Sequence, residues 1–320
     1  MNAPIDWLLC GEAWIAYRVR RDLLDQPDDH PLTQAARAAM LAYPAIRGLI
    51  EELTHWDEMP PVSAHKNAGL LLHKLVFLAD IGIRADDPGM PAVLGQVMSH
   101  RSAERIFTVP MDVSGHSALT GVHQAWALCD APSIVYALTM MGLGSDPRVT
   151  AARNALKSLV RENGWPCAVS AELGTFRGPG RKQDPCPYAT LLMLKALAQD
   201  PSAVNEAAIG IEILLDLWQN SREKHPYIFY MGDDFRKVKA TFVWYDILHT
   251  AFVLSMFATA HEDPRFKDMM LQLGNKVDAE GKMTAESAWT PWKGWEFADK
   301  KNPSRWITCL YWIIRKQSEK

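Results

Sequence analysis

The chain contains 320 residues, of which 48% are hydrophobic and 22% are charged, a composition typical of a globular protein with a substantial core. A net charge of −3 provides no general attraction for nucleic acid or anionic lipid, and the single short basic cluster is too small for a nucleic-acid face. No apolar run reaches the roughly 18 residues that span a bilayer. We therefore expect neither nucleic-acid binding nor a membrane span.

The first residues and the cysteines predict a cytoplasmic protein. Within residues 1–9, Asp6 stands where a secretory signal would carry basic residues followed by an apolar core. The cysteines are odd in number and widely scattered, which suits reduced thiols better than a framework of disulfides. They are Cys10, Cys129, Cys167, Cys186 and Cys309.

In chain order, the helical periodicity first predicts helices over 14–24, 32–42 and 45–54. Asp-Pro pairs then recur along the chain. Asp accepts N–H bonds at a helix N-cap and Pro fits the first helical position, so each pair predicts a helix start, as at 147–161 and 201–218. The pairs are Asp87-Pro88, Asp146-Pro147, Asp200-Pro201 and Asp263-Pro264.

A second, more apolar set of helices falls between these starts with a similar spacing. We expect it at 65–83, 131–142, 185–199, 242–260 and 304–316. The alternation predicts repeated pairs, with the apolar helix inside and the capped helix outside. Enough pairs are present to close a ring, so we expect an all-α fold, an α/α toroid, in a single domain over 1–320. An open solenoid is the structural alternative.

Long irregular segments interrupt this pattern at 163–183, 219–237 and 281–302. Loops of such length inside a helical domain often carry function. They contain Trp165, Trp289, Trp292 and Trp295. These aromatic side chains either close a cavity or pack against the helices, and both interpretations stay open.

Residues 174–188 contain the most informative motif, a Gly-rich basic loop that ends in Asp184-Pro185-Cys186. Alone, Asp184 is explained as a helix N-cap and Cys186 as a small buried hydrophobe. A carboxylate and a thiolate two residues apart can also converge on one metal ion where the chain enters a helix. The N-terminus of that helix also stabilises the thiolate. Such a pair needs a third ligand, ideally an imidazole.

His249 offers that imidazole, one repeat further along, within Asp246-Ile-Leu-His249-Thr. Asp246 precedes it by three residues and therefore shares its helix face. The carboxylate of Asp246 could orient the imidazole or accept a hydrogen bond behind it. The competing interpretation of His249 is a core histidine with its hydrogen bonds satisfied.

Two segments together resemble the zinc site of protein prenyltransferase β-subunits. One is an Asp-x-Cys pair that follows a basic loop, and the other is Asp-x-x-His-Thr on the next inner helix. These β-subunits belong to the terpenoid cyclase/prenyltransferase superfamily of α/α toroids. The resemblance covers 174–197 and 245–257 and is architectural elsewhere. It implies that Asp184, Cys186 and His249 bind one Zn²⁺, with Arg181 and Lys182 in place of the basic residues that hold a diphosphate. Pro187 and Leu248 stand where that family carries aromatic side chains.

Other side chains are candidates around such a metal, which with three protein ligands keeps a position for water or a substrate atom. The general acid–base candidates are Asp246, Tyr188, Tyr245 and His123. The basic loop predicts contact with an anionic group of the substrate, although a solvated loop would carry the same residues. The candidates for substrate binding are Arg177, Arg181, Lys182 and His116.

Together these features favour a zinc-dependent hydrolase or lyase that encloses a small, partly apolar molecule able to carry a negative charge. One alternative is the transfer of a prenyl or alkyl group from a diphosphate to a zinc-bound thiolate. Another is a helical-repeat scaffold that binds a partner without catalysis. A small-molecule substrate is expected in the leading hypothesis, and the formation of homo-oligomers stays open.

Overall fold

A computed structural model describes residues 2–115, 119–174, 176, 183–220, 223 and 235–319. Over this part of the chain, fourteen α-helices and two short antiparallel strand pairs are present, so the predicted all-α class is confirmed. The chain divides into unit 1, Met1–Leu49 with Asp233–Lys320, and unit 2, Ile50–Gly232. The single-domain organisation over 1–320 stays a prediction.

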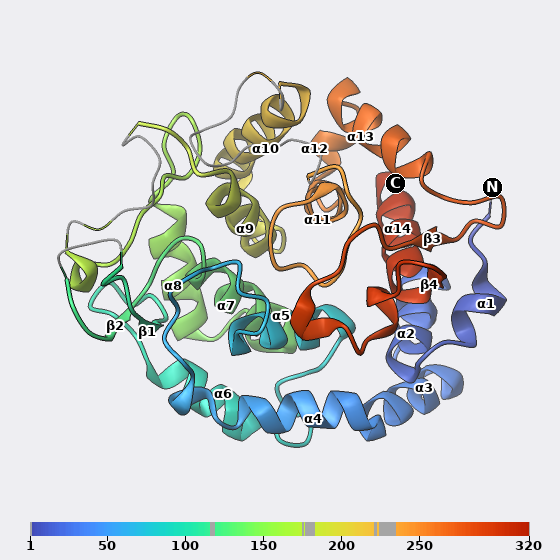
Figure 1. Cartoon of the computed structure of the whole chain (residues 1–320), viewed down its shortest axis with the longest axis horizontal. Coiled ribbons are helices and arrows are strands. Elements are labelled where there is room, and N and C mark those ends of the chain that lie inside the picture. The colour runs from blue at the N-terminus through green and yellow to red at the C-terminus, as the bar shows by residue number, and fades with distance from the viewer. Residues whose placement is uncertain are drawn as a thin grey trace. The chain divides into compact units, whose positions relative to one another are not determined.

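Unit 1 takes its helices from both ends of the chain, as the colours of Figure 1 show. The helix α4 (Pro44–Leu53) contains the residue at which unit 1 ends and unit 2 begins. The other elements of unit 1 are α1 (Ile5–Leu9), α2 (Ala13–Arg18) with a π-helical turn (Val19–Leu23), α3 (Pro31–Ala42), α11 (Ile247–Leu254), α12 (Ala258–His261), α13 (Pro264–Gly274), β3 (Met283–Thr284), β4 (Pro303–Ser304) and α14 (Arg305–Ser318).

The core of unit 1 forms around α14, which contacts α1, α2 and α11 and buries every residue from Trp306 to Ile314. Its N-terminus begins at Ser304, whose hydroxyl accepts the N–H of Ile307. The rings of Trp14 and Trp306 pack edge to face with centroids 4.9 Å apart. Trp295 also packs edge to face on Trp14, at 6.0 Å. This tryptophan of the 281–302 segment therefore packs against a side chain of α2.

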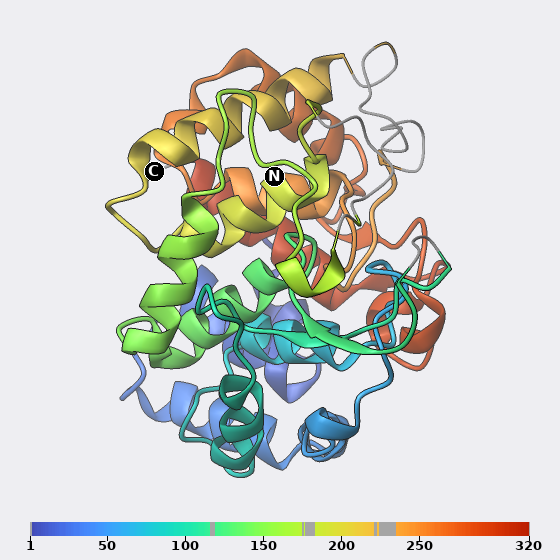
Figure 2. The same ribbon diagram turned by 90° about the vertical axis from the view of Figure 1, so that its left-hand side faces the viewer.

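Unit 2 contains the remaining elements, which Figure 2 shows from the side. They are α5 (Leu71–Ile81), α6 (Met90–Ser99), β1 (Val109–Met111), β2 (His123–Ala125), α7 (Ala131–Leu138) with a π-helical turn (Thr139–Leu143), α8 (Pro147–Lys157), α9 (Pro187–Leu197) and α10 (Val204–Gln219). The strands β1 and β2 pair antiparallel, with Val109 opposite Ala125 and Met111 opposite His123.

Within unit 2, apolar helices are covered by more polar ones. All residues of α7 and α9 are buried, and α7 contacts both α5 and α9. The helix α8 buries only Val149, Ala152 and Leu156, which share one face because they recur at intervals of three and four. This pairing of a buried with a partly exposed helix agrees with the pattern expected from the sequence.

Two of the four Asp-Pro pairs begin helices as predicted. Asp146 and Asp263 are the N-caps of α8 and α13, and each carboxylate accepts a backbone N–H two residues later. The prediction is wrong at Asp87, which instead accepts the N–H of Arg84, while α6 begins three residues later at Met90. It is also wrong at Asp200, because α10 begins only at Val204.

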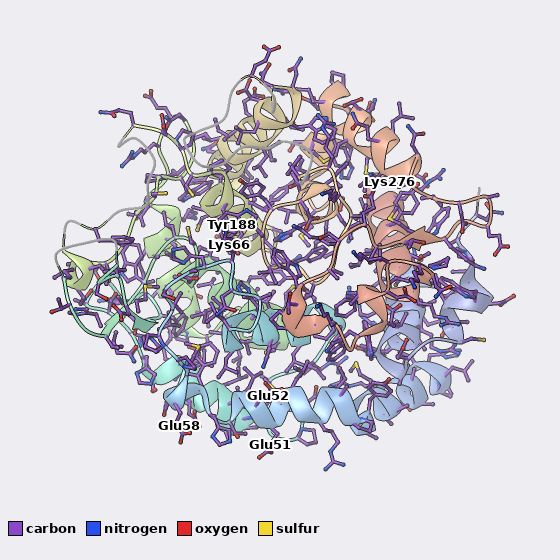
Figure 3. The ribbon with its side chains drawn as sticks, viewed as in Figure 1. Glu51, Glu52, Glu58, Lys66, Tyr188 and Lys276 are labelled. Atoms are coloured by element: carbon purple, nitrogen blue, oxygen red, sulfur yellow. The ribbon has the colours of Figure 1, made fainter. Side chains whose placement is uncertain are left out.

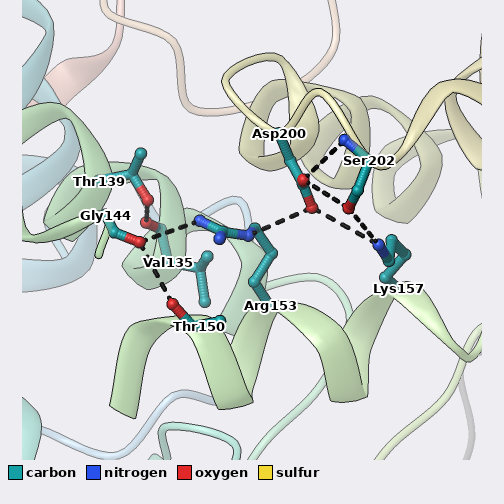
Figure 4. Close-up of polar contacts among 8 residues, drawn as sticks. All are labelled: Val135, Thr139, Gly144, Thr150, Arg153, Lys157, Asp200 and Ser202. Atoms are coloured by element: carbon teal, nitrogen blue, oxygen red, sulfur yellow. Dashed lines mark hydrogen bonds and ion pairs between the residues drawn. The ribbon is translucent and has the colours of Figure 1, made fainter. Parts of the chain in front are cut away.

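The reason at Asp200 is visible in Figure 4. Its carboxylate accepts the N–H and the hydroxyl of Ser202, which forms a turn, and it faces two basic side chains of α8. The carboxylate lies 3.4 Å from Nε of Arg153 and 3.6 Å from Nζ of Lys157. The carboxylate thus closes a local turn through Oδ1 and pairs with a neighbouring helix through Oδ2, and α10 begins only after that turn.

No helix in the described ranges is both long enough and apolar enough to cross a membrane.

Candidate metal centre

Cys186 caps the first turn of α9. The helix begins at Pro187, and the Sγ atom of Cys186 accepts the N–H of Ala189 at 3.5 Å. The capping residue is therefore Cys186, and not Asp184 two residues earlier. The thiol side chain is 1% exposed, whereas Asp184 is partly exposed. The Asp-x-Cys motif thus places a buried sulfur at a helix N-terminus, where N–H groups point toward it.

Two further cysteines of unit 2 lie beside this motif. Ala127 pairs antiparallel with Val169, and Pro166 pairs antiparallel with Pro185. The same registers continue through the hydrogen bonds from Leu128 N to Ala168 O and from Cys186 N to Trp165 O. They place Cys167 opposite Cys129 on one side and opposite Asp184 on the other. We call these residues, with Asp130 and Cys186, the thiol–carboxyl cluster.

The thiols of the thiol–carboxyl cluster interact with one another. A hydrogen bond with Cys129 raises the pKa of Cys186 well above its ordinary value, and burial adds to this rise. The pKa of Cys129 is also raised, because burial and neighbouring negative charge outweigh the lowering effect of its hydrogen bond with Cys186. Both cysteines are therefore held as thiols within unit 2, and forming a thiolate there requires a compensating positive charge.

Asp130 occupies the position before α7 but does not cap that helix. Its Oδ2 instead lies 2.7 Å from Nδ1 of His65, while its Oδ1 is buried and receives no hydrogen bond from a described residue. A second histidine continues this network, since Nε2 of His73 lies 2.8 Å from the carbonyl oxygen of His65. The carboxylate of Asp130 therefore binds His65 and leaves the start of α7 without a side-chain cap.

Tyr188 stands on the first turn of α9 (Figure 3), and burial leaves the residue only 1% exposed. Burial raises the pKa of its phenol well above 10, and the negative charges of Asp130, Cys129 and Cys186 add to this effect. The group consequently keeps its proton at neutral pH. As an acid–base candidate, Tyr188 can donate a hydrogen bond but is unsuited to act as a general base.

His249 lies in unit 1, on the first turn of α11, and is fully buried. Its Nδ1 lies 2.9 Å from the carbonyl oxygen of Trp244, and its ring stacks on Phe242 with centroids 4.6 Å apart. A carbonyl oxygen only accepts hydrogen bonds, so Nδ1 carries the proton. In the neutral ring, the lone pair is therefore on Nε2.

Asp246 is the N-cap of α11, and its Oδ1 accepts the N–H groups of Leu248 and His249, each at 3.0 Å. The imidazole of His249 is thus oriented by a backbone carbonyl, while Asp246 holds the helix start. The Oδ2 of Asp246 is buried and receives no hydrogen bond from a described residue. Burial raises the pKa of this carboxyl to about 7, against the lowering effect of Lys239.

The remaining candidates are distributed over both units. Tyr245, in unit 1, is 6% exposed and packs against Trp244 with ring centroids 5.0 Å apart. His123, in unit 2, lies on β2 with its Nε2 3.2 Å from the carbonyl oxygen of Thr120. The predicted substrate-binding residues lie outside the described residues; they are His116, Arg177, Arg181 and Lys182.

Unit 2 contains Asp184 and Cys186, and unit 1 contains His249. In the described part of the chain, no group of three or more His, Cys, Asp and Glu side chains has the geometry to hold a metal ion. Comparison with models of known protein families finds no match, and comparison with curated proteins finds none either.

Proposed function

We propose that this chain is a zinc-dependent hydrolase or lyase, with Asp184, Cys186 and His249 as the metal ligands. The observation that carries the proposal is the hydrogen bond between Nδ1 of His249 and the carbonyl of Trp244. A histidine that binds zinc characteristically donates its other ring N–H to a carbonyl or carboxylate, which fixes the tautomer and the ring orientation. The buried imidazole of His249 has that arrangement.

The donors of unit 2 support the same proposal. Cys186 is a buried sulfur at a helix N-terminus, and Asp184 precedes it by two residues. Carboxylate, thiolate and imidazole are the ligand types that zinc prefers, and three of them leave one coordination position for the reaction. A bound zinc ion would lower the pKa of a water molecule or polarise a substrate oxygen.

Asp246 and Tyr188 are the groups that would move protons in this reaction. The carboxyl of Asp246 is held by two backbone N–H groups through Oδ1, and its Oδ2 is where a proton would be held. Burial raises the pKa of this carboxyl and a bound zinc ion would lower it again, so Asp246 would serve as a proton acceptor. Tyr188, which keeps its proton, would act as a donor.

We also propose that the two units form one α/α toroid. Support comes from unit 2, where the buried helices α7 and α9 alternate with the more exposed α8 and α10. The apolar helices α11 and α14 continue the alternation in sequence. An experimental structure with α5, α7, α9, α11 and α14 around one axis would agree with the toroid, and an open row of helices would contradict it.

Metal analysis of the purified chain tests the zinc proposal. We expect about one zinc per chain, reduced to background in Cys186→Ala and His249→Ala. Cys309→Ala is the matched control, because this thiol is equally buried, belongs to α14 and is not among the proposed ligands. Circular dichroism of each variant shows whether the fold is intact. Wild-type protein that binds no zinc, even after zinc is added, would overturn the proposal.

One further variant distinguishes the proposed ligands from the neighbouring thiols. Cys129→Ala should retain zinc, because Cys129 is not among the proposed ligands. If zinc is lost in Cys129→Ala but retained in His249→Ala, the metal belongs to the thiol–carboxyl cluster of unit 2 and the proposed ligand set is wrong.

A further inference from the structure

A pocket of about 250 Å³ lies in unit 1, and none of its lining residues is proposed to bind zinc. It is formed where the start of α2, the turn between α3 and α4, and the segment before β4 come together. Its lining combines two carboxylates with three aromatic rings and no basic side chain. The lining residues are Glu12, Trp14, Tyr43, Ala45, Pro291, Gly294, Trp295 and Glu296.

The carboxylate of Glu12 is the unusual group of this pocket. Glu12 occupies the N-cap position of α2, but its side chain makes no capping hydrogen bond. Its Oε2 is buried and receives no hydrogen bond from any described residue. Burial is the main cause of the raised pKa of Tyr43 and of Glu296, and the negative charge of Glu12 raises both further. A buried carboxylate oxygen without a donor is costly, and a positive charge bound beside it lowers that cost.

Glu296, the second carboxylate, is already occupied. Its Oε1 accepts the N–H of Trp306 at 2.8 Å, and its Oε2 accepts the N–H of Arg305 at 2.9 Å. It therefore holds the first turn of α14. A hard metal cation such as Ca²⁺ or Mg²⁺ needs six or more oxygen ligands, whereas Glu12 is the one carboxylate here that is not committed to the backbone. This lining is a poor site for such an ion.

The aromatic walls favour a different kind of cation. The ring of Trp295 is held by contacts with Trp14, Trp292 and Phe297, with centroids 6.0, 5.4 and 5.6 Å apart. Aromatic rings attract weakly hydrated organic cations through their quadrupoles, and rings together with a carboxylate recognise alkylated ammonium groups. The fixed position of Trp295 means that little side-chain freedom is lost when a ligand binds.

We propose that this pocket binds a small organic ammonium ion, with Glu12 as the counter-ion and Trp14, Tyr43 and Trp295 as its aromatic walls. The site does not depend on the zinc proposal, since its residues belong to unit 1 and none of them is a proposed zinc ligand. The charge of the ligand is the decisive feature, because a neutral molecule would leave Oε2 of Glu12 without a compensating charge.

Isothermal titration with choline chloride tests this proposal, with 3,3-dimethylbutan-1-ol as the uncharged molecule of the same shape. We expect saturable choline binding, and binding of the alcohol weaker by about tenfold or more. Equal binding of the two molecules would show that the pocket is merely apolar and would overturn the proposal. So would the absence of binding by choline, tetramethylammonium and a primary alkylammonium ion alike.

Two variants locate the binding to this pocket. Glu12→Gln keeps the shape of the side chain and removes its charge, and Trp295→Leu removes one aromatic wall. Each should weaken choline binding by about tenfold or more. Glu58→Gln, an exposed glutamate of unit 2, should bind choline as wild type does. Unchanged binding in both pocket variants would contradict the proposal, and the choline–alcohol comparison on wild type decides the question even if one variant fails to fold.

Discussion

The ammonium of Lys195 and the carboxylate of Asp80 form a buried ion pair in the core of unit 2. Nζ of Lys195 lies 3.1 Å from Oδ1 of Asp80, and the two side chains are 2% and 3% exposed. The hydroxyl of Tyr136 donates to the same carboxylate at 2.6 Å, and Nζ of Lys195 lies 4.2 Å from the centre of the Tyr136 ring. The contact therefore joins α5, α7 and α9, which otherwise pack through apolar side chains.

Replacing Lys195 with Met should strongly destabilise the protein. The carboxylate of Asp80 would remain in the core without its positive partner, and such a loss typically costs about 3–5 kcal/mol. Urea unfolding monitored by circular dichroism measures the change in the free energy of unfolding.

The double variant Lys195→Met with Asp80→Asn is the control. It removes both charges, so it should recover part of the lost stability, because a neutral amide is less costly to bury than an isolated carboxylate. If the double variant is less stable than Lys195→Met alone, the uncompensated charge is not the cause of the destabilisation.

The pair of His65 and Asp130 should make stability depend on pH. Burial lowers the pKa of His65, but the charge of Asp130 and the hydrogen bond to it raise the pKa more, so that it lies above the ordinary value of 6.5. Stabilisation by a histidine whose pKa is raised in the folded state is complete below 6.5. It is lost as the pH rises through the folded-state pKa.

Asp130→Asn should bring the pKa of His65 below 6.5, because only the effect of burial then dominates. The imidazole titration followed by NMR measures this change. Asp57→Asn, which alters the exposed pair with His100, should leave the titration of His65 as it is in wild type. A titration of His65 unaffected by Asp130→Asn would show that Asp130 is not what raises the pKa.

Ionisation of Glu296 should lower the free energy of unfolding as the pH rises. Burial raises the pKa of its carboxyl from 4.5 to about 7, and the charge of Glu12 adds to the rise. Between these values the folded state binds more protons than the unfolded state, so the free energy of unfolding falls with increasing pH. A shift of this size corresponds to a loss of about 3 kcal/mol across the interval.

Glu296→Gln removes this titration, and its side-chain oxygen can still accept one N–H of the α14 terminus. Urea unfolding at pH 4.5 and pH 7.5 should therefore show a smaller loss of stability in the variant than in wild type. Glu12→Gln should reduce the loss only in part, because burial is the larger cause. If Glu296→Gln loses as much stability between pH 4.5 and pH 7.5 as wild type does, the titration of Glu296 is not the cause of the loss.

The helix starts illustrate how far local sequence patterns predict this structure. Asp146 and Asp263 cap helices as expected, because their interactions involve only the next two or three residues. The same Asp-Pro signal fails at Asp200, because its carboxylate accepts the N–H of Ser202 in a turn and α10 begins only at Val204. A local bond of the capping type therefore does not by itself fix the residue at which a helix begins.

The candidate site was predicted only where its residues are close in sequence or match a known motif. The Asp184–Cys186 pair and His249 were singled out in this way. Cys129, Cys167 and the bond from Asp130 to His65 were not assigned, although Cys129-Asp130 stands before α7 much as the Asp-x-Cys pair stands before α9. The partner of Asp130 is 65 residues away in the chain, and no local spacing indicates such a contact.

The sequence by itself determined the helical class, the apolar character of the buried helices and the caps at Asp146 and Asp263, because these follow from periodicity and from bonds within one turn of a helix. The tertiary structure decided which carbonyl orients His249, which residue binds Asp130, and how far burial shifts the pKa of Asp246 and Glu296. Desolvation and long-range hydrogen bonds depend on which distant segments pack around a group. That information arises only when the chain has folded.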